Sequence, residues 1–266
     1  MRRIDELMSL RGRRALITGA NGGIGSVMAQ TLAELDCELV LLDRPGSNFA
    51  PLLQSLAPFV GESSPLVVEC DLEDEQDRGE MIADVAAGGL NILINNAAFV
   101  GTSGLEGWGV PFEAQSVETW RRALEVNLTS VFHLCQGFTP ALRQSGNGSV
   151  INVASIYGAY GPDWQLYAGT TMGNPAAYAA SKGGVIQFSR WLATTLSPEI
   201  RVNVISPGGV FRQQAPEFVN RYCERTPLKR MAVEDDFRGA VAYLASDMSA
   251  YVTGQNLFVD GGWGCW

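Results

Sequence analysis

Residues 18–25 read Thr-Gly-Ala-Asn-Gly-Gly-Ile-Gly, and this stretch decides the fold. An apolar run at residues 15–18 leads into it, and a helical pattern at residues 26–35 follows it. Glycines at such a turn let the backbone approach a diphosphate, and the new helix offers its free N–H groups and positive dipole end to that group. A glycine-rich turn between a strand and a helix therefore predicts a dinucleotide site near the N-terminus.

Short apolar or β-branched runs alternate with longer helical patterns along the whole chain. The runs lie at residues 15–18, 39–42, 66–68, 92–94, 149–153, 202–205 and 256–259. Continuous apolar strands are buried on both faces, and alternation of strand and helix predicts a parallel, doubly wound sheet. We expect one α/β domain of Rossmann type over residues 1–266, with helices flanking the sheet and a small lid at about residues 211–230.

Composition and charge exclude several classes of protein. The 266 residues are 46% hydrophobic and 18% charged, and the net charge of −9 would repel the phosphate backbone of nucleic acid. The N-terminal segment lacks the apolar stretch of a signal peptide, and no apolar run approaches membrane-spanning length. We expect a cytoplasmic protein with no membrane or nucleic-acid partner. Neither a zinc site nor a disulfide framework is suggested by the five cysteines, which form no Cys-x-x-Cys pair.

The chain contains one histidine, His133. A Ser-His-Asp or Cys-His hydrolase would have to use it, and a site with several histidine ligands is impossible. His133 lies in an apolar run at residues 131–135 that reads as helix. We therefore expect a packed or solvent-edge histidine and no metal centre.

Tyr178 and Lys182 form a candidate acid/base pair. Asn174 and Pro175 predict a helix start, with the asparagine as N-cap and the proline in the first turn. Residues four apart share a helix face, so the ammonium would lie near the phenol and lower its pKa toward working pH. That change would make Tyr178 usable as a general acid/base. Taken alone, the same spacing also describes a surface pair on an amphipathic helix.

The order of these motifs resembles the short-chain dehydrogenase/reductase family over almost the entire chain. Thr18 with its G-x-x-x-G-x-G turn is similar to the family signature, and Asn95-Asn96-Ala97-Ala98 resembles its Asn-Asn-Ala-Gly turn, with Ala98 where glycine is usual. Asn127, Ser155, Tyr178 and Lys182 follow in the family's order. The resemblance implies an NAD(P)-dependent oxidoreductase that interconverts a secondary alcohol and a ketone.

The resemblance also implies a role for each matched catalytic residue. Ser155 would hydrogen-bond the substrate oxygen, and Tyr178 would take or give the substrate proton during hydride transfer. Lys182 would also hold the nicotinamide ribose. Asn127 would position a water that relays the proton outward, although a polar residue in a helical pattern can equally be structural.

Cofactor-binding residues follow from the same matches. Asp43 ends the second strand, where a carboxylate can accept hydrogen bonds from the ribose hydroxyls and would repel a 2′-phosphate, so we expect NAD rather than NADP. Asn21, at a position often basic in NADP users, supports that choice, whereas Arg44 opposes it. The expected set is Gly19, Asn21, Gly22, Gly23, Ile24, Gly25, Asp43, Arg44, Asp71, Leu72, Asn96, Ala97, Ala98, Tyr178, Lys182, Pro207, Gly208 and Val210.

Two segments interrupt the alternation and predict the walls of a substrate pocket. Residues 99–115 are rich in glycine, and residues 156–174 mix glycine with aromatic side chains. The interval from Ser155 to Tyr178 is longer than the family's, so we expect residues 156–174 to form an insertion over the mouth of the site. Tyr167 is nearer the family's position, but its i+4 residue is Thr171, which supplies no cation.

Substrate class is suggested only by loop similarity. Residues 156–158, 167–172 and 211–214 resemble family members from glycan and flagellin-modification pathways, which implies a sugar or sugar derivative. Arg212, Gln213 and Gln214 could bind a polar substrate or be solvated loop residues. A non-sugar small alcohol stays open, as does a non-catalytic NAD-binding redox sensor or scaffold. The glycine spacing and the length of the chain disfavour an extended epimerase or dehydratase.

The chain ends in an apolar tail that contains Trp263 and Trp266. Exposed tryptophans would be unfavourable in water, so we expect both to pack on a neighbouring subunit. Since the family forms tetramers, we expect a homotetramer or homodimer.

Overall fold

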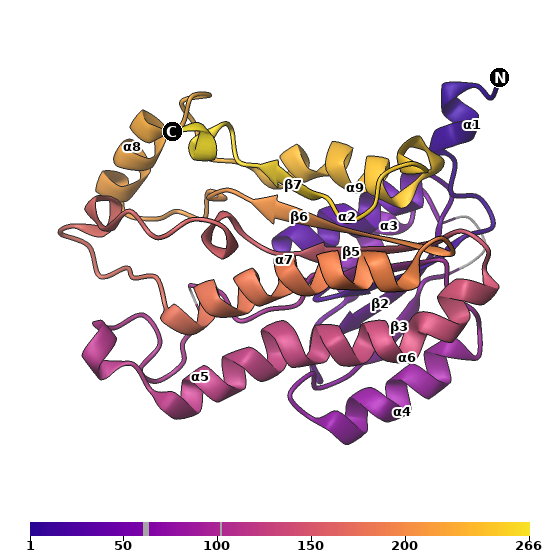
Figure 1. Cartoon of the computed structure of the whole chain (residues 1–266), viewed down its shortest axis with the longest axis horizontal. Coiled ribbons are helices and arrows are strands. Elements are labelled where there is room, and N and C mark those ends of the chain that lie inside the picture. The colour runs from indigo at the N-terminus through magenta and orange to yellow at the C-terminus, as the bar shows by residue number, and fades with distance from the viewer. Residues whose placement is uncertain (61–63, 102) are drawn as a thin grey trace.

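A computed structural model describes residues 1–60, 64–101 and 103–266 as one layered α/β domain (Figure 1). Within these residues seven strands form one parallel sheet in the order β3-β2-β1-β4-β5-β6-β7. The predicted doubly wound sheet is confirmed, and each predicted run lies in one strand. The strands are β1 (Arg14–Thr18), β2 (Glu38–Asp43), β3 (Leu66–Glu69), β4 (Ile92–Asn95), β5 (Gly148–Val153), β6 (Ile200–Pro207) and β7 (Asn256–Val259).

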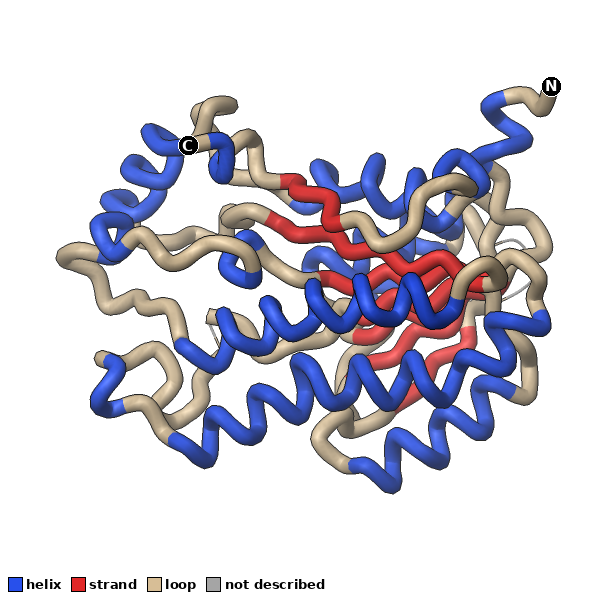
Figure 2. Tube along the Cα trace, in the orientation of Figure 1, coloured by secondary structure: helices blue, strands red, loops and turns tan. Residues whose placement is uncertain are grey.

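Helices cover both faces of the sheet (Figure 2). One face is covered by α4 (Glu75–Ala86), α6 (Ser130–Gln144) and α7 (Ala176–Leu196), with α5 (Val117–Leu124) beside α7. The other face is covered by α2 (Gly23–Glu34), α3 (Ala50–Leu56) and α9 (Arg238–Ala245). The short α1 (Ile4–Met8) precedes β1, and α8 (Pro216–Arg225) lies beyond the sheet, in the predicted lid.

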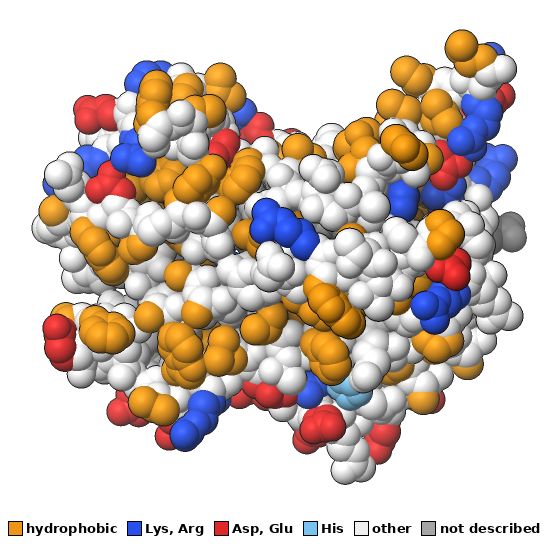
Figure 3. Space-filling model, viewed as in Figure 1, with side chains coloured by type: hydrophobic (Ala, Val, Ile, Leu, Met, Phe, Trp, Pro, Cys, Tyr) orange, Lys and Arg blue, Asp and Glu red, His pale blue; other side chains and the backbone are white. Residues whose placement is uncertain are grey.

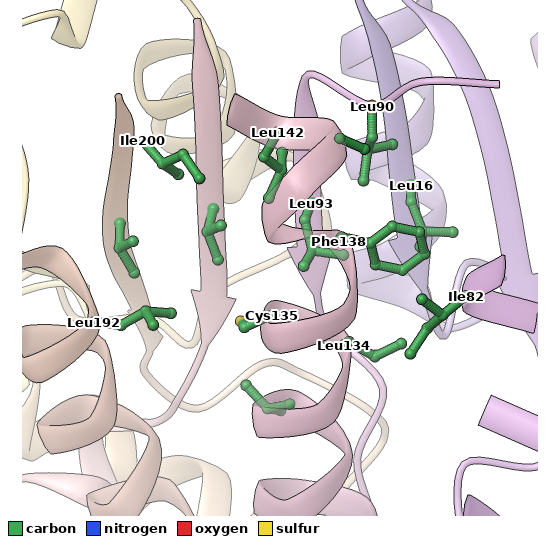
Figure 4. Packing of buried hydrophobic residues seen from close by; sticks show 14 of the residues in the cluster. Leu16, Ile82, Leu90, Leu93, Leu134, Cys135, Phe138, Leu142, Leu192 and Ile200 are labelled. Atoms are coloured by element: carbon green, nitrogen blue, oxygen red, sulfur yellow. The ribbon is translucent and has the colours of Figure 1, made fainter. Parts of the chain in front are cut away.

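Side chains of the central strands alternate between two apolar cores. Leu16 of β1 packs on one side with Phe138 of α6, while Ala15 and Ile17 pack on the other side with Met28 of α2. Figure 4 shows Leu16, Leu93 and Phe138 meeting in the first core. Full burial of a side chain such as Phe138 stabilises the fold by about 2–3 kcal/mol.

The two outer strands depart from the prediction that every strand is buried on both faces. Leu66 and Val67 of β3 are 45% and 37% exposed, and Leu257 of β7 is 36% exposed. The reason is topological, because the strand order places β3 and β7 at the edges of the sheet. Apolar runs alone could not distinguish an edge strand from a central one.

The carboxyl ends of the strands carry the segments that the sequence singled out. The arrowheads of β6 and β7 point toward the end of the molecule that holds α8 (Figure 1). Strand β1 lies between β2 and β4, so the chain winds in opposite directions from this point. Open α/β sheets bind ligands in the crevice at such a point. In the described part of the chain, no helix is long and apolar enough to cross a bilayer.

The expectation that Trp263 packs on a neighbouring subunit is wrong. Its side chain is 1% exposed within its own chain, where the ring stacks on Tyr222 of α8 with the centroids 6.2 Å apart. The Arg225 guanidinium lies over the Trp263 ring, 4.4 Å from its centroid. Trp266 is 70% exposed. The sequence could not show that α8 folds back over the C-terminal turn.

Candidate active site

The glycine turn is shaped so that two of its positions admit no side chain. Gly19 has a φ of 64°, and a Cβ there would lie 2.9 Å from the Ala97 Cα. A Cβ on Gly25 would lie 2.1 Å from the Gly19 carbonyl oxygen. Glycine at these positions therefore brings the β1 turn against both the β4 turn and the start of α2.

The start of α2 can accept a diphosphate. Gly22 is the N-cap and supplies no side-chain cap, and the first turn holds no acidic residue. The first N–H groups of this helix are thus available to an anion. Asn21 adds a buried Nδ2 that has no hydrogen-bond partner in the protein. A glycine cradle, open N–H groups and an unpartnered buried donor fit the diphosphate side of NAD(P).

Asp43 lies beside this turn, as the sequence predicts. One carboxylate oxygen accepts from the Asn21 N–H at 2.9 Å, and the other accepts from the Arg44 N–H at 2.9 Å and the Ser47 hydroxyl at 3.3 Å. The backbone thereby fixes the carboxylate at the end of β2. Asp71 and Leu72 follow β3 at the same sheet edge, where the Cys70 N–H bonds the Asp43 carbonyl at 3.0 Å.

Thr18 and Asn96 join the turns that follow β1 and β4. The Thr18 hydroxyl accepts from the N–H groups of Asn96 and Ala97, both at 3.0 Å, and the Asn96 amide donates to the carbonyls of Thr18 and Gly19, both at 3.0 Å. Asn96 and Ala97 thus lie at the glycine turn, while Ala98 continues the chain beyond it. In the sequence Thr18 is recognisable only as part of a signature, and its bracing role is not predictable from it.

Ser155, Tyr178 and Lys182 come together at the end of β5. Ser155 follows β5, is 6% exposed, and hydrogen-bonds the Tyr178 phenol. The Lys182 Nζ lies 5.8 Å from the centroid of the Tyr178 ring and donates to the Val153 carbonyl at 2.8 Å. Three of the four predicted catalytic residues therefore form one cluster.

The pKa of Tyr178 differs from the expectation. Burial raises this pKa above its ordinary value, the hydrogen bond with Ser155 lowers it, and the nearby Tyr167 raises it. Burial also lowers the pKa of Lys182 to about 8. The prediction that the lysine would depress the tyrosine pKa is wrong here, since the ammonium is directed at the Val153 carbonyl. Among the partners of Tyr178, Ser155 is the one that favours phenolate.

Asn127 lies in a π-helical turn, Glu125–Thr129, between α5 and α6. Its Oδ1 accepts from the Phe99 N–H at 2.7 Å, and its Nδ2 donates to the Phe99 carbonyl at 3.0 Å and the Ser181 hydroxyl at 3.2 Å. These bonds tie the loop after β4 to α7 next to Lys182. Single π turns inside helices often accompany functional sites. Its role as the anchor of a proton-relay water stays a prediction.

Helix α7 begins one residue later than predicted. It starts at Ala176, with Pro175 in extended geometry as N-cap and no side-chain cap. The Asn174 side chain, expected to cap the helix, instead hydrogen-bonds Tyr167. The sequence pattern could not reveal this competing partner from the insertion.

The turn after β6 holds Pro207, Gly208 and Val210. The Gly208 N–H donates to the Val259 carbonyl at 2.9 Å, and the Gly209 N–H donates to the Tyr222 hydroxyl at 2.5 Å. Val210 forms a bridge with Ala232. This turn is therefore fastened to both β7 and α8, and the predicted contact of Val210 with the nicotinamide stays a prediction.

The insertion forms an aromatic layer with α8, which we define as Tyr157, Tyr167, Phe218, Tyr222 and Trp263. The rings of Tyr167 and Phe218 lie 5.3 Å apart, and the hydroxyls of Tyr157 and Tyr167 are hydrogen-bonded at 2.8 Å. Burial raises the pKa of both phenols, so they stay protonated at neutral pH. The sequence predicts that the insertion lies near the site but does not predict this pair, since nothing in it shows which tyrosines meet.

Of the two other predicted segments, 99–115 lies beside the catalytic cluster, since Tyr178 packs against the core that contains Trp108, whereas Arg212 of the other segment lies at the glycine turn. The segment 99–115, of which residue 102 lies outside the described residues, forms an apolar pocket of about 190 Å³ with α5 and the start of α7, lined by Trp108, Phe112 and Ala177. Arg212 pairs with Glu234 beside Gly23, at the glycine turn. Gln214 donates to the Val210 carbonyl at 2.8 Å.

His133 and the cysteines take structural positions. The half-buried His133 of α6 accepts at Nδ1 from the Arg78 Nε of α4 at 3.2 Å, which confirms the expected packed or solvent-edge histidine. Among the described residues, the cysteines carry free thiols, and no cluster of three His, Cys, Asp or Glu side chains could hold a metal ion.

Known proteins resemble this chain over nearly its full length. A family model described as enoyl-(acyl carrier protein) reductase matches residues 19–264. The Probable galactose dehydrogenase GalD of Rhizobium meliloti (strain 1021) is 33% identical over 97% of each chain.

Two solved structures share the fold. A protein of Beutenbergia cavernae, provisionally named an NAD(P)-dependent gluconate 5-dehydrogenase and solved with NADP at low occupancy, has a TM-score of 0.84 and 30% identity, over 98% of this chain and 100% of that one. A short-chain dehydrogenase of Leptospira borgpetersenii with bound NAD+ has a TM-score of 0.82 and 30% identity, over 99% of this chain and 96% of that one. The chain belongs to the short-chain dehydrogenase/reductase family of NAD(P)-dependent oxidoreductases.

Proposed function

We propose that this enzyme oxidises a secondary hydroxyl of a sugar or sugar derivative to a ketone with NAD, or runs the reverse reduction. The single observation that carries the proposal is the cluster of Ser155, partly buried Tyr178 and Lys182 at the end of β5, at the same sheet edge as a glycine turn that fits a dinucleotide.

Each residue of the cluster has its own role in proton transfer. The Ser155 hydroxyl holds the substrate oxygen by a hydrogen bond and favours the charged form of Tyr178. Tyr178 takes the hydroxyl proton during oxidation or returns it during reduction. The Lys182 ammonium donates to the Val153 carbonyl, and Asn127 donates to the hydroxyl of the adjacent Ser181. The nicotinamide, when bound, supplies or accepts the hydride.

NAD is the cofactor that we propose, on the geometry of Asp43. Its carboxylate is held at the end of β2 by three donors beside the glycine turn. A fixed negative charge there suits ribose hydroxyls and repels a 2′-phosphate. Related structures contain either NAD+ or NADP, so the choice rests on this residue. Replacing Asp43 with serine should lower the preference for NAD over NADP, measured as the ratio of the two Kd values.

A polyhydroxylated substrate is supported by the wall next to Tyr178. The Tyr157 and Tyr167 hydroxyls and the Asn174 amide form a buried polar chain inside the aromatic layer. Aromatic faces pack on the C–H faces of a sugar, while such hydroxyls can bond its additional oxygens. The names of the galactose and gluconate dehydrogenase relatives agree with this class.

One alternative is a dehydrogenase of a non-sugar small alcohol, favoured by the apolar pocket at Trp108 and Phe112. A non-catalytic NAD-binding sensor or scaffold is disfavoured, because a protein without chemistry has no use for a buried lysine next to a partly buried tyrosine. Burying Lys182 costs stability, as its lowered pKa shows.

We also propose that the enzyme is a cytoplasmic homodimer or homotetramer. Phe132 on α6 and Trp191 on α7 are 46% and 57% exposed, and Phe188 lies between them with centroids 5.9 and 6.4 Å away. Figure 3 shows hydrophobic side chains gathered over α5, α6 and α7. Such a patch is typical of a subunit contact. The free buried thiols accord with a reducing compartment. A monomer in light scattering would contradict the oligomer.

A substrate panel tests the function. Aldoses, sugar acids, polyols and simple secondary alcohols are each incubated with NAD and with NADP, and formation of the reduced cofactor is followed by absorbance. We expect turnover with at least one polyhydroxylated compound and a higher kcat/KM with NAD. Cofactor binding without turnover of any compound would favour the sensor, and turnover of simple alcohols alone would favour the non-sugar alternative.

A further inference from the structure

Arg212 is positioned at the cofactor turn. Its guanidinium lies so close to Gly23 that a Cβ on this glycine would be 2.5 Å from the Arg212 Nη2 and 2.9 Å from the Glu234 Oε1. Gly23 is the first residue of α2, whose open N–H groups face the diphosphate site described above. The guanidinium therefore lies next to the uncapped first turn of the helix.

Helix α2 itself contains no basic residue. Residues 21–30 carry no charged side chain, so any cation for a diphosphate has to come from another element. Arg212 comes from the turn after β6, which is fastened by the Phe211 N–H to the Ala232 carbonyl at 2.9 Å. A guanidinium suits a diphosphate because it donates two parallel hydrogen bonds to adjacent oxygens.

In this structure Glu234 is the ion-pair partner of the Arg212 guanidinium. The two side chains form an ion pair, and they are 38% and 36% exposed. Glu234 begins an acidic turn, Glu234–Phe237, in which Asp236 is paired with Arg230 while Asp235 is exposed. This turn packs against α2, so an unpaired Glu234 would present negative charge to an incoming anion.

We propose that Arg212 is a cofactor-binding residue that exchanges its partner. Its guanidinium releases Glu234 and binds the diphosphate of NAD(P) at the start of α2. The exchange costs little, because an exposed ion pair contributes little stability. Glu234 borders an open hollow of about 380 Å³ with Gly23 and Val233 and is solvated once it is released. Glu234 thus weakens cofactor binding, and Arg212 strengthens it. The inference rests on the proposed function, since it requires that a dinucleotide binds at the glycine turn.

Calorimetric titration of the full-length protein with ADP-ribose tests the exchange without any need for turnover. Glu234→Gln should bind ADP-ribose about fivefold more tightly, because Arg212 no longer has to leave a carboxylate. Arg212→Ala should bind it at least about tenfold more weakly, and Arg212→Lys should lie between the wild type and Arg212→Ala. In the Arg212→Ala background, Glu234→Gln should give a smaller gain than it gives in the wild type. Adenosine, which lacks phosphate, should bind all variants alike.

Opposite signs for the two single variants would support the exchange. Equal loss of thermal stability in both variants, with unchanged Kd for ADP-ribose, would show a structural ion pair and overturn it. Failure of the wild type to bind ADP-ribose at all would instead overturn the proposed function. Both side chains are partly exposed, and Arg212→Lys keeps the charge, so at least one variant is expected to fold normally.

Discussion

The glycine turn and the aromatic layer, which form the proposed cofactor and substrate sides, lie at the same sheet edge but are built by different means. The turn uses backbone N–H groups and positions where no side chain fits, as Gly19 and Gly25 show. The aromatic layer uses side chains from the insertion, α8 and the C-terminal turn, joined by contacts such as that between Tyr167 and Phe218.

This difference reflects the ligands. A diphosphate has the same shape and charge in every dinucleotide, so a fixed backbone cradle serves it. A substrate wall has to match one alcohol among many, and side chains can be changed without disturbing the sheet. Tyr178 lies beside Ser155 at the end of β5, at this sheet edge, and belongs to neither region, so its substitution can separate cofactor binding from chemistry.

Apart from loss of the Tyr178 hydroxyl, the largest effect is expected from Ser155→Ala, which acts on the substrate side. We expect kcat to fall by about 10²–10³-fold, because the substrate oxygen loses a preorganised donor. The hydrogen bond from Ser155 also lowers the pKa of Tyr178, so the pH at which oxidation becomes half-maximal should rise in the variant. Stopped-flow rates across a pH series measure both changes, and an unshifted profile would contradict the role of Ser155 on Tyr178.

The next effect is expected from Gly25→Ala, which acts on the cofactor side. The added Cβ would meet the Gly19 carbonyl, so overpacking should cost about 1–3 kcal/mol of unfolding free energy. Affinity for ADP-ribose should fall about tenfold or more, since the turn has to open. Gly79→Ala in α4 is the matched control, because nothing lies within 4 Å of its Cβ. Equal affinity in the two variants would show that the tight turn is not needed for binding.

A smaller effect, on stability, is expected from Lys182→Met. Burial lowers the pKa of Lys182 to about 8, from 10.5, so the folded state disfavours the charged lysine. Removing the charge should stabilise the protein at pH 7 by about 1–2 kcal/mol, after the lost bond to the Val153 carbonyl is offset.

The pH dependence of this gain follows from the sign of the shift. Between pH 8 and 10.5 the unfolded chain binds more protons than the folded one, so wild-type stability rises with pH and the advantage of Lys182→Met disappears. Urea unfolding at several pH values measures it, with the exposed Lys229→Met as control. A gain in stability that does not depend on pH would mean that burial does not lower the pKa of Lys182.

The smallest effect is expected from Tyr167→Phe in the aromatic layer. The ring contact with Phe218 is kept, and the hydroxyl that bonds Tyr157 and Asn174 is lost, at a cost of about 1 kcal/mol for each bond. KM should rise a few-fold for a polyhydroxylated substrate and stay unchanged for a simple secondary alcohol. Tyr251→Phe, at a fully exposed tyrosine, is the control. An equal change in KM for both substrates would show that the Tyr167 hydroxyl does not recognise the additional oxygens of the substrate.

The sequence predicts the cofactor side far better than the substrate side, and the reason is physical. Glycine at residues 19 and 25 is required by the backbone, so the spacing itself carries the geometry. The seven strands were likewise visible as apolar runs, although edge and central strands look alike in sequence. In contrast, the bond from Asn174 to Tyr167 and the burial of Trp263 under α8 depend on contacts between distant segments. No local pattern contains that information.

The pKa of Tyr178 illustrates the same limit inside the catalytic cluster. The spacing to Lys182 correctly places an ammonium near the phenol, at 5.8 Å from the ring centroid. It does not show that burial dominates or that the ammonium bonds the Val153 carbonyl. Proximity in sequence thus predicts the pair but not its electrostatics.

Tyr178→Phe separates cofactor binding from chemistry most directly. Phenylalanine keeps the ring and removes the proton-transferring hydroxyl, so the Kd for NAD should stay within about twofold of wild type while turnover of the best substrate falls by about 10²–10⁴-fold. Fluorescence titration with NAD and single-turnover measurement on the same protein preparation give both values. Undiminished turnover in Tyr178→Phe would contradict the assignment of Tyr178 as the acid/base.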